Sequence, residues 1–195
     1  MVDHGELSLC CHLTNELSWF GFMIREAKVE DAGKIAEIHV ASWRSTYAGI
    51  VPQTYLDSLD VSKRSVMWTK ILSKTDPKEK ILVVLKDDLI VGFASIGPNR
   101  DKKLSFDGEL YAIYLLESHQ KLGLGKQLFN RSVQELLQRG FKSMFVWVLQ
   151  DNPTCTFYKK MGGRLIDKKS EEIGGKTLYE VAYSWNNISD RISSF

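Results

Sequence analysis

Four segments of the chain carry apolar residues at intervals of three and four positions. This spacing gathers apolar side chains on one helix face, so each segment is predicted to form an amphipathic helix. Glu30 and Asp31 stand where the dipole of the first helix favours negative charge, and Gly140 follows the third helix as its stop. The predicted helices cover residues 30–43, 53–73, 124–139 and 154–161.

Short runs rich in β-branched residues lie between the helical segments and predict strands. Asp87-Asp88 and Gly174-Gly175 separate neighbouring runs, as hairpin turns do. The predicted strands cover residues 23–27, 80–85, 89–96, 108–116, 141–149, 164–169 and 176–185. This order predicts an α/β fold, in which about seven strands form a mixed, mostly antiparallel, twisted sheet with helices on both faces.

The length of 195 residues, with 44% hydrophobic and 26% charged residues, fits one globular domain. Residues 1–22 show neither the helical nor the strand spacing of apolar residues and are predicted to be an N-terminal extension. Met23 is a possible alternative start. The domain is expected over residues 23–186, followed by a C-terminal tail over residues 187–195.

Charge and cysteine content exclude several functional classes. Lys and Arg exceed Asp and Glu by 26 to 24, a net charge of +2, which is too balanced for nucleic-acid binding that depends on charge. Cys10, Cys11 and Cys155 have neither metal-ligand spacing nor a disulfide pattern, so no metal site is expected and a reducing compartment is favoured. The sequence has no apolar run long enough to span a bilayer and no basic start of a signal peptide. A cytoplasmic protein without a membrane partner is predicted.

The segment 114–126 joins a predicted buried strand to the start of a long helix. A helix start offers free backbone N–H groups and partial positive charge, and Gly123 and Gly125 let a diphosphate approach the backbone closely. The segment lacks a Walker loop, because Gln120 and Gln127 stand where that motif needs Gly and Ser or Thr. Leu128 stands where a dinucleotide fingerprint needs its third glycine.

Three segments in order carry a family resemblance. The Q-x-x-G-x-G pattern of Gln120–Gly125 resembles the acetyl-CoA diphosphate loop of GNAT N-acetyltransferases. Residues 152–163, with Asn152, Phe157-Tyr158 and Gly162-Gly163, are similar to that family's N-x(4–5)-F-Y-x-K-x-G-G segment. Residues 38–52 are similar to the first-helix region of many bacterial members, and the resemblance spans residues 23–186.

The resemblance implies a GNAT-like sheet whose central strands splay apart to bind coenzyme A. It implies acetyl-CoA as co-substrate and a small-molecule or peptide amine as acceptor. The chain departs from the family pattern at Glu117, where proline is frequent, and at Lys121, where glycine is frequent. The positions that match cofactor contacts are Ile113, Tyr114, Leu115, Gln120, Lys121, Leu122, Gly123, Leu124, Gly125, Lys126 and Asn152.

Two catalytic residues are predicted. Tyr158 matches the tyrosine that protonates the departing thiolate, as a general acid. Glu109 is a candidate base, because strand alternation would place it on the same face as Tyr111 and Ile113. His39 is a second candidate base.

His39, Trp43 and Tyr47 recur at four-residue spacing and are predicted to line the acceptor pocket. Trp147 and Trp185 are predicted to pack against the sheet. The competing hypotheses are a CoA-binding regulatory module without turnover and a nucleotide-binding protein. The sequence leaves the oligomeric state open, and family analogy alone suggests a homodimer.

Overall fold

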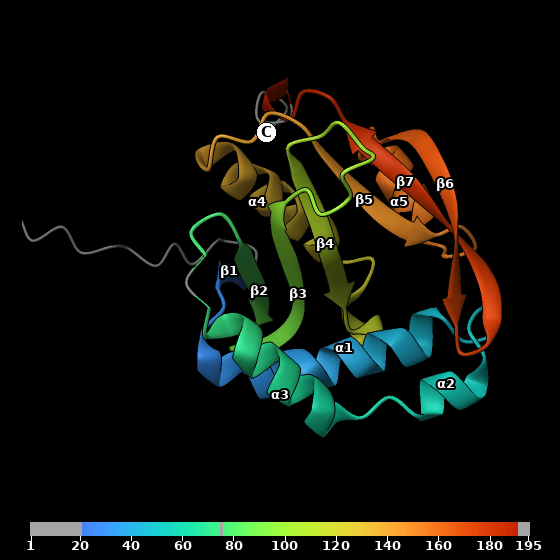
Figure 1. The fold of residues 1–195 in the computed structure, drawn as a ribbon. Coiled ribbons are helices and arrows are strands. Elements are labelled where there is room, and N and C mark those ends of the chain that lie inside the picture. Colours follow the sequence, from blue (N-terminus) through green and yellow to red (C-terminus); the bar gives the residue numbers. More distant parts are fainter. Residues whose placement is uncertain (1–20, 75, 191–195) are drawn as a thin grey trace, which may run out of the picture.

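A seven-stranded sheet organises the molecule, with strand order β1-β2-β3-β4-β5-β7-β6 (Figure 1). The computed structural model describes residues 21–74 and 76–190. Of the expected N-terminal extension over residues 1–22, only Gly21 and Phe22 are described. Residues 191–195 of the expected tail also lie outside the described residues. The strands are β1 (Phe22–Glu26), β2 (Lys80–Lys86), β3 (Leu89–Pro98), β4 (Gly108–Leu115), β5 (Met144–Leu149), β6 (Arg164–Ile173) and β7 (Lys176–Trp185).

In the described part of the chain, five α-helices connect these strands, and they cover both faces of the sheet (Figure 1). Helices α1 and α3 bury one apolar cluster against β2 and β3, centred on Ile35, Trp68 and Phe93. On the other face α4 buries a larger cluster, which includes Leu128 and Phe129. The helices are α1 (Ala32–Thr46), α2 (Gln53–Asp57), α3 (Val61–Leu72), α4 (Leu124–Gln138) and α5 (Cys155–Lys160), with short 3-10 turns at Val29–Asp31 and Glu117–His119.

All strand pairs are antiparallel except β4 and β5, which run parallel. These two strands pair at only two positions, Gly108 with Met144 and Glu109 with Phe145. The predicted α/β fold with a mixed, mostly antiparallel sheet and splayed central strands is therefore confirmed. Within the described ranges, no helix is both long and apolar enough to cross a membrane.

The predicted helix over residues 53–73 is wrong in one respect, because the structure divides it into α2 and α3. Leu59, which lies between the two helices, packs in a small apolar cluster with Val51 and Leu56. Asp60 caps α3 by accepting a hydrogen bond from the Lys63 backbone N–H at 3.0 Å. The strand predicted over residues 164–169 runs on to Ile173, because the β6–β7 ladder continues as far as the turn at Gly174-Gly175.

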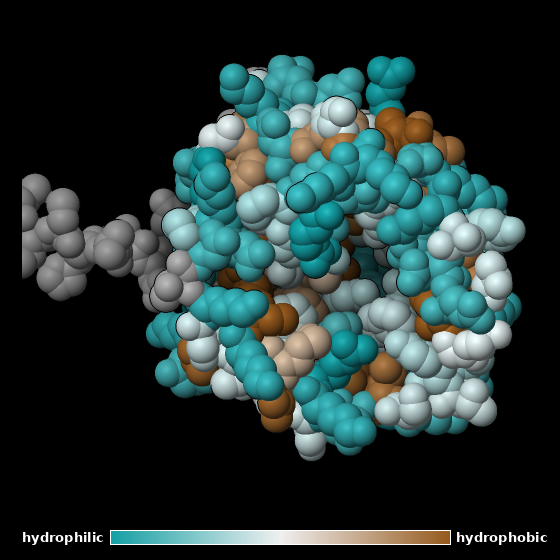
Figure 2. Space-filling view, in the orientation of Figure 1, coloured by the Kyte–Doolittle hydropathy of each residue, from teal (hydrophilic) through white to brown (hydrophobic). Residues whose placement is uncertain are grey.

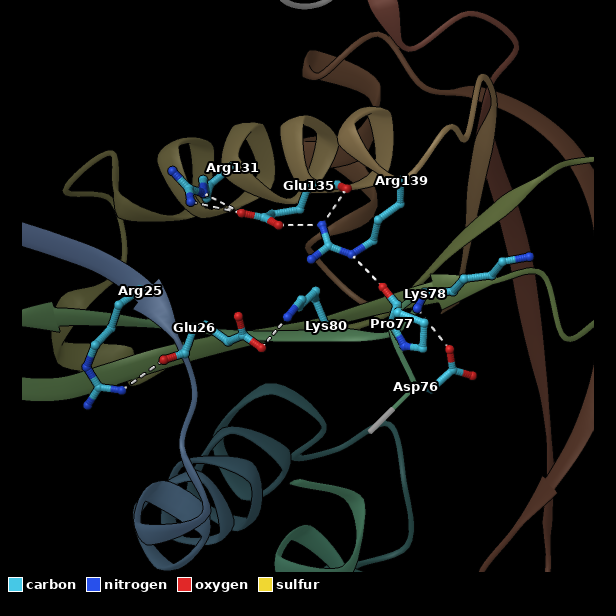
Figure 3. A network of polar contacts seen from close by, with 9 residues as sticks. All are labelled: Arg25, Glu26, Asp76, Pro77, Lys78, Lys80, Arg131, Glu135 and Arg139. Carbon is cyan, nitrogen blue, oxygen red and sulfur yellow. Dashed lines mark hydrogen bonds and ion pairs between the residues drawn. The ribbon is translucent and has the colours of Figure 1, made fainter. Parts of the chain in front are cut away.

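A polar network fastens the last turns of α4 to the segment before β2 (Figure 3). Glu135 is buried and forms ion pairs with Arg131 at 2.8 Å and with Arg139. Arg139 also donates a hydrogen bond to the backbone carbonyl of Pro77 at 3.1 Å. The contacts hold α4 in a fixed direction across the sheet, which in turn fixes where its first turn lies.

His39 belongs to the core between α1, α3 and the sheet. Its ring stacks on Tyr114, with 5.4 Å between centroids, and its Nδ1 accepts a hydrogen bond from Trp68 at 3.2 Å. Burial lowers the pKa of His39 from 6.5 to about 4, and the nearby Arg64 charge adds to this effect. The imidazole is therefore uncharged at neutral pH.

This burial predicts an acid-dependent loss of stability. The unfolded chain binds a proton at His39 below pH 6.5, whereas the folded chain does so only near pH 4, so stability falls as pH drops through this window. Between pH 7 and 4.5 the expected cost is roughly 2 kcal/mol. Urea unfolding at both pH values should show a smaller loss for His39→Gln, which keeps an acceptor for Trp68 and does not titrate. Equal losses in both proteins would contradict the assignment.

Candidate active site

A cavity of about 520 Å³ lies where β4 and β5 part. Its walls combine residues from both faces of the sheet. Ile113 and Val146 pack with the α4 cluster, whereas Ala112 and Tyr114 pack with the α1 cluster. The cavity therefore passes through the sheet between the two strands. Figure 2 shows the molecule hollowed near the centre of the face that it draws.

An extra residue in β4 helps to part the strands. Ser95 pairs with Ala112 and Ile96 with Leu110, so Tyr111 has no partner on β3 and forms a β-bulge. Its hydroxyl donates a hydrogen bond to the Pro98 carbonyl at 2.6 Å, over Gly97. A side chain at Gly97 would collide with the Tyr111 hydroxyl, its Cβ lying 2.5 Å from that oxygen.

The prediction that Glu109 lies on the same face of the strand as Ile113 is wrong, because of the bulge. Leu110 and Ile113 pack in the same cluster although they are three residues apart, so the strict alternation is broken between them. Glu109 consequently lies on the face opposite Ile113. Its carboxylate is buried, accepts hydrogen bonds from the Arg100 guanidinium at 2.7 and 3.2 Å, and is not part of the cavity lining.

One mouth of the cavity, which we call the glycine mouth, is formed by the loop before α4 and by residues around α5. Gly123 caps α4 in a left-handed conformation with φ of 81°. The first turn of α4 then leaves backbone N–H groups without helical partners. A side chain at Gly125 would start 3.4 Å from Leu115, which also lines the cavity. Both glycines keep this helix start open to a ligand.

Three lysines give the glycine mouth positive charge. Lys121, Lys126 and Lys160 all line the cavity. A helix N-terminus with nearby cations is a site for phosphate groups. Gln120 shapes the loop, because its Nε2 donates to the Leu115 carbonyl at 3.2 Å.

Most of the predicted cofactor residues are brought together here, but two are not. Leu124 is buried in the core beneath α4, and Leu122 is 58% exposed, so neither side chain lines the cavity. Only their backbone groups remain available to a ligand. The predicted residues that line the cavity are Ile113, Tyr114, Leu115, Gln120, Lys121, Gly123, Gly125, Lys126 and Asn152.

Tyr158, on α5, contributes its side chain to the cavity wall. Its ring is buried between Phe157 and Tyr183, with centroids 5.4 and 6.0 Å away. Burial raises the pKa of Tyr158 above its ordinary value, so the hydroxyl stays protonated at neutral pH. No hydrogen bond joins this hydroxyl to another residue of the described ranges. It is a proton donor without a partner among the described residues.

The second mouth, which we call the aromatic mouth, is formed by Tyr47 at the end of α1, Tyr111 on β4 and Trp147 on β5. Tyr47 accepts a hydrogen bond from Asn152 Nδ2 at 3.3 Å, and Trp43 packs against it with 4.8 Å between ring centroids. Burial raises the pKa of Tyr47.

Of the three residues predicted to bind the acceptor, Tyr47 alone lines the cavity. Trp43 stands behind it and donates to the Tyr114 hydroxyl at 3.0 Å. His39 lies deeper, in the core described above. These two residues position aromatic side chains of the wall and do not form its surface.

Sequence reasoning missed two residues of the aromatic mouth. The sequence predicts that Trp147 packs against the sheet, yet Trp147 lines the cavity. Its neighbours Val146 and Val148 line it too, and they also pack in the α4 cluster. Strand alternation alone does not place Tyr111 in the cavity wall, because the bulge breaks the alternation at this residue. Period-two alternation within residues 144–149 could have indicated that Trp147 faces away from α4. Trp185, in contrast, packs in the core as predicted.

The family comparison agrees with this arrangement. The model of the acetyltransferase (GNAT) family matches residues 34–163. The uncharacterized N-acetyltransferase YuaI of Bacillus subtilis (strain 168) is 42% identical over 168 residues, covering 85% of this chain and 94% of that protein. The spermidine N(1)-acetyltransferase of Thermoplasma acidophilum is 24% identical over 161 residues, covering 80% of this chain and 97% of that protein.

A solved structure shares the fold. The crystal structure of the PaiA N-acetyltransferase from Thermoplasma acidophilum, in complex with coenzyme A, matches with a TM-score of 0.66 and 22% identity, covering 84% of this chain and 99% of that one. The predicted family resemblance is confirmed by the family model and by the 42% identity to YuaI. The chain therefore belongs to the acetyltransferase (GNAT) family of enzymes.

Proposed function

We propose that this enzyme transfers the acetyl group of acetyl-CoA directly to a primary amine. One observation carries the proposal. A single cavity passes through the sheet, with a positively charged helix start at one mouth, an unpartnered tyrosine hydroxyl in its wall and a second mouth for the acceptor. Direct transfer requires that one site hold the donor and the acceptor together, with the reacting atoms close and aligned.

The glycine mouth supplies what a coenzyme A diphosphate needs. Backbone N–H groups after Gly123 would donate to phosphate oxygens, and Lys121 and Lys126 would balance their charge. The absence of side chains at Gly123 and Gly125 allows the close approach.

The open edge of β4 suits the amide-containing arm of the cofactor. Beyond Glu109, the edge of β4 that faces β5 has no ladder partner, while its other edge remains paired with β3. The Leu115 carbonyl already accepts hydrogen bonds from Gln120 Nε2 and Ser42 Oγ. The other backbone groups on the open edge, among them those of Ile113, would bind amides in an extended ligand, as a neighbouring strand would.

Tyr158 would act as the general acid. Its hydroxyl donates a proton to the sulfur that leaves as the new amide bond forms. The raised pKa of Tyr158 keeps that proton in place until the sulfur becomes basic.

The proposed mechanism gives Glu109 no proton-transfer role. Both of its carboxylate oxygens accept hydrogen bonds from Arg100, and Glu109 does not line the cavity. The base role predicted from sequence thus stays a prediction, and the test below addresses it. The cytoplasmic location and the homodimer also stay predictions.

Turnover separates this proposal from a CoA-binding module. In Tyr158→Phe we expect kcat to fall at least about 10²-fold, because general acid catalysis is lost, while KM for acetyl-CoA changes less than about 3-fold. Thiol release with a panel of amines measures both. The matched control is Tyr183→Phe, whose ring stacks on Tyr158 but lies outside the cavity. An unchanged kcat in Tyr158→Phe would remove Tyr158 from the mechanism.

Gly125→Val tests the glycine mouth. The added side chain begins 3.4 Å from Leu115, so it should raise KM for acetyl-CoA about 10-fold or more by blocking close approach. Gly33→Val is the control, since Gly33 also occupies the second position of its helix and meets only Ser65 Oγ, at 3.9 Å. Equal KM values in both variants would argue against cofactor binding at this loop.

Glu109→Gln separates a positioning role from a base. If Glu109 only holds Arg100, kcat/KM should fall less than about 5-fold and its pH profile should keep its shape, while the melting temperature drops. A loss of 10²-fold or more, together with loss of the acidic limb of the pH profile, would instead establish Glu109 as the base.

A further inference from the structure

Strand β6 forms one edge of the sheet, and this edge is long and exposed (Figure 1). Within the described ranges β6 pairs with β7 alone, and eight of its ten residues are exposed. The opposite edge, β1, has only five residues, four of which are half-buried. An exposed edge strand offers a row of backbone N–H and C=O groups to another strand.

The edge lacks two features that commonly keep edge strands apart. β6 contains no proline, and the bulge in its pairing with β7 lies at Ile166, near its start. From Asp167 to Ile173 the ladder with β7 runs without a break. A second strand could therefore pair along these seven residues, which have Ser170 at their centre.

The charges of this regular stretch are symmetric about Ser170. Lys168 and Lys169 precede it, and Glu171 and Glu172 follow it. In an antiparallel pair of identical strands, the two-fold axis is perpendicular to the sheet and keeps every residue on its own face. When Ser170 lies opposite its own copy, Lys169 faces the partner's Glu171. Lys168 then faces the partner's Glu172.

The neighbouring symmetric registers lose this match. In one of them Lys169 lies opposite its own copy, and in the other Glu171 does. A parallel pair in register also opposes like charges. Opposite charges stabilise a pair of facing strand residues, whereas like charges destabilise it. The charge pattern therefore selects the antiparallel register centred on Ser170.

Three of the four charges have no ionic partner within the described part of the chain. Lys168, Glu171 and Glu172 form no ion pair there. Lys169 pairs with Glu180 at 3.2 Å and stays 40% exposed. The two carboxylates that follow Ser170 are thus available to a partner.

We infer that a second copy of this chain binds the free edge of β6, through an antiparallel β6–β6 ladder centred on Ser170. Backbone hydrogen bonds join the two sheets into one, and four Lys–Glu pairs set the register. Ile166, which is 40% exposed, lies across from the partner's turn, so the pairing also covers apolar surface. This inference does not depend on the proposed acetyl transfer.

The same ladder places both active sites on one face of the joined sheet. Lys169 Nζ lies 4.2 Å from the centroid of the Trp147 ring, which lines the aromatic mouth. The two-fold axis preserves faces, so Glu171 of the partner subunit lies on the same side as Lys169. Each copy therefore adds a carboxylate close to the aromatic mouth of the other.

Charge exchange tests the ladder in the full-length enzyme, by sedimentation and light scattering between about 1 and 100 μM. The wild type should form a dimer whose Kd rises with salt. Lys168→Glu and Glu172→Lys each oppose like charges twice per dimer, so each should raise Kd at least about 10-fold. The double variant Lys168→Glu/Glu172→Lys exchanges the charges and should return Kd to within about 3-fold of the wild type.

The matched control is Lys70→Glu, the same charge change at an exposed position of α3, which should leave Kd within about 2-fold. Thiol release by each variant, measured in parallel, reports whether the active site is folded.

A cysteine at the symmetry centre tests the register. Opposite residues of an antiparallel pair have Cα atoms about 4.5–5.5 Å apart, which suits a disulfide. Ser170→Cys should therefore give a covalent dimer on oxidation, beyond the background of the wild type. Asp167→Cys is the control on the same exposed strand, because its own copy would lie about 20 Å away.

Several outcomes would overturn the inference. One is a wild type that stays monomeric over the whole concentration range. Another is a dimer whose Kd is unchanged by both single reversals, or a double variant that dimerises no better than the single ones. Equal crosslinking of Ser170→Cys and Asp167→Cys would also overturn it. None of these outcomes bears on acetyl transfer, which thiol release measures separately.

Discussion

The parallel ladder between β4 and β5 ends after two residue pairs, and the active site depends on this early end. A continued ladder would close the sheet and leave no cavity. The bulge at Tyr111 helps to prevent it, because one extra residue in β4 shifts its register with β3 by one position and bends β4. Arg100 then binds Glu109 beside the last β4–β5 pair and covers the bulged tyrosine. The strands thus part at a fixed place.

The two mouths of the resulting passage differ in charge. The glycine mouth has a helix start and three lysines, all suited to an anionic cofactor. The aromatic mouth has cations that are paired with carboxylates and rest on rings. Between them lie apolar strand residues and the Tyr158 hydroxyl, so the reacting groups would meet away from bulk water. In such surroundings a positioned proton donor is worth more than it is in water.

How far the sequence predicted this site depends on the range of each interaction. The glycine loop is contiguous, so its local spacing indicates the helix start and the open backbone. The Phe157-Tyr158 segment is contiguous as well, and the family resemblance that it carries implies the role of the tyrosine. The position of Glu109 could not be read in the same way, because the bulge is set by pairing with Ser95 and Ile96 on another strand. The same holds for Lys169 on Trp147, a contact between different strands. Long-range pairing also decided that His39 lies in the core, since Trp68 on α3 and Tyr114 on β4 enclose it.

A crystal structure of the enzyme grown with coenzyme A tests the central claim most directly. The account predicts the diphosphate against the backbone N–H groups that follow Gly123, the pantetheine arm along the open edge of β4, and the sulfur within hydrogen-bond distance of the Tyr158 hydroxyl. Coenzyme A bound elsewhere, or a passage between β4 and β5 that stays closed to it, would contradict the account.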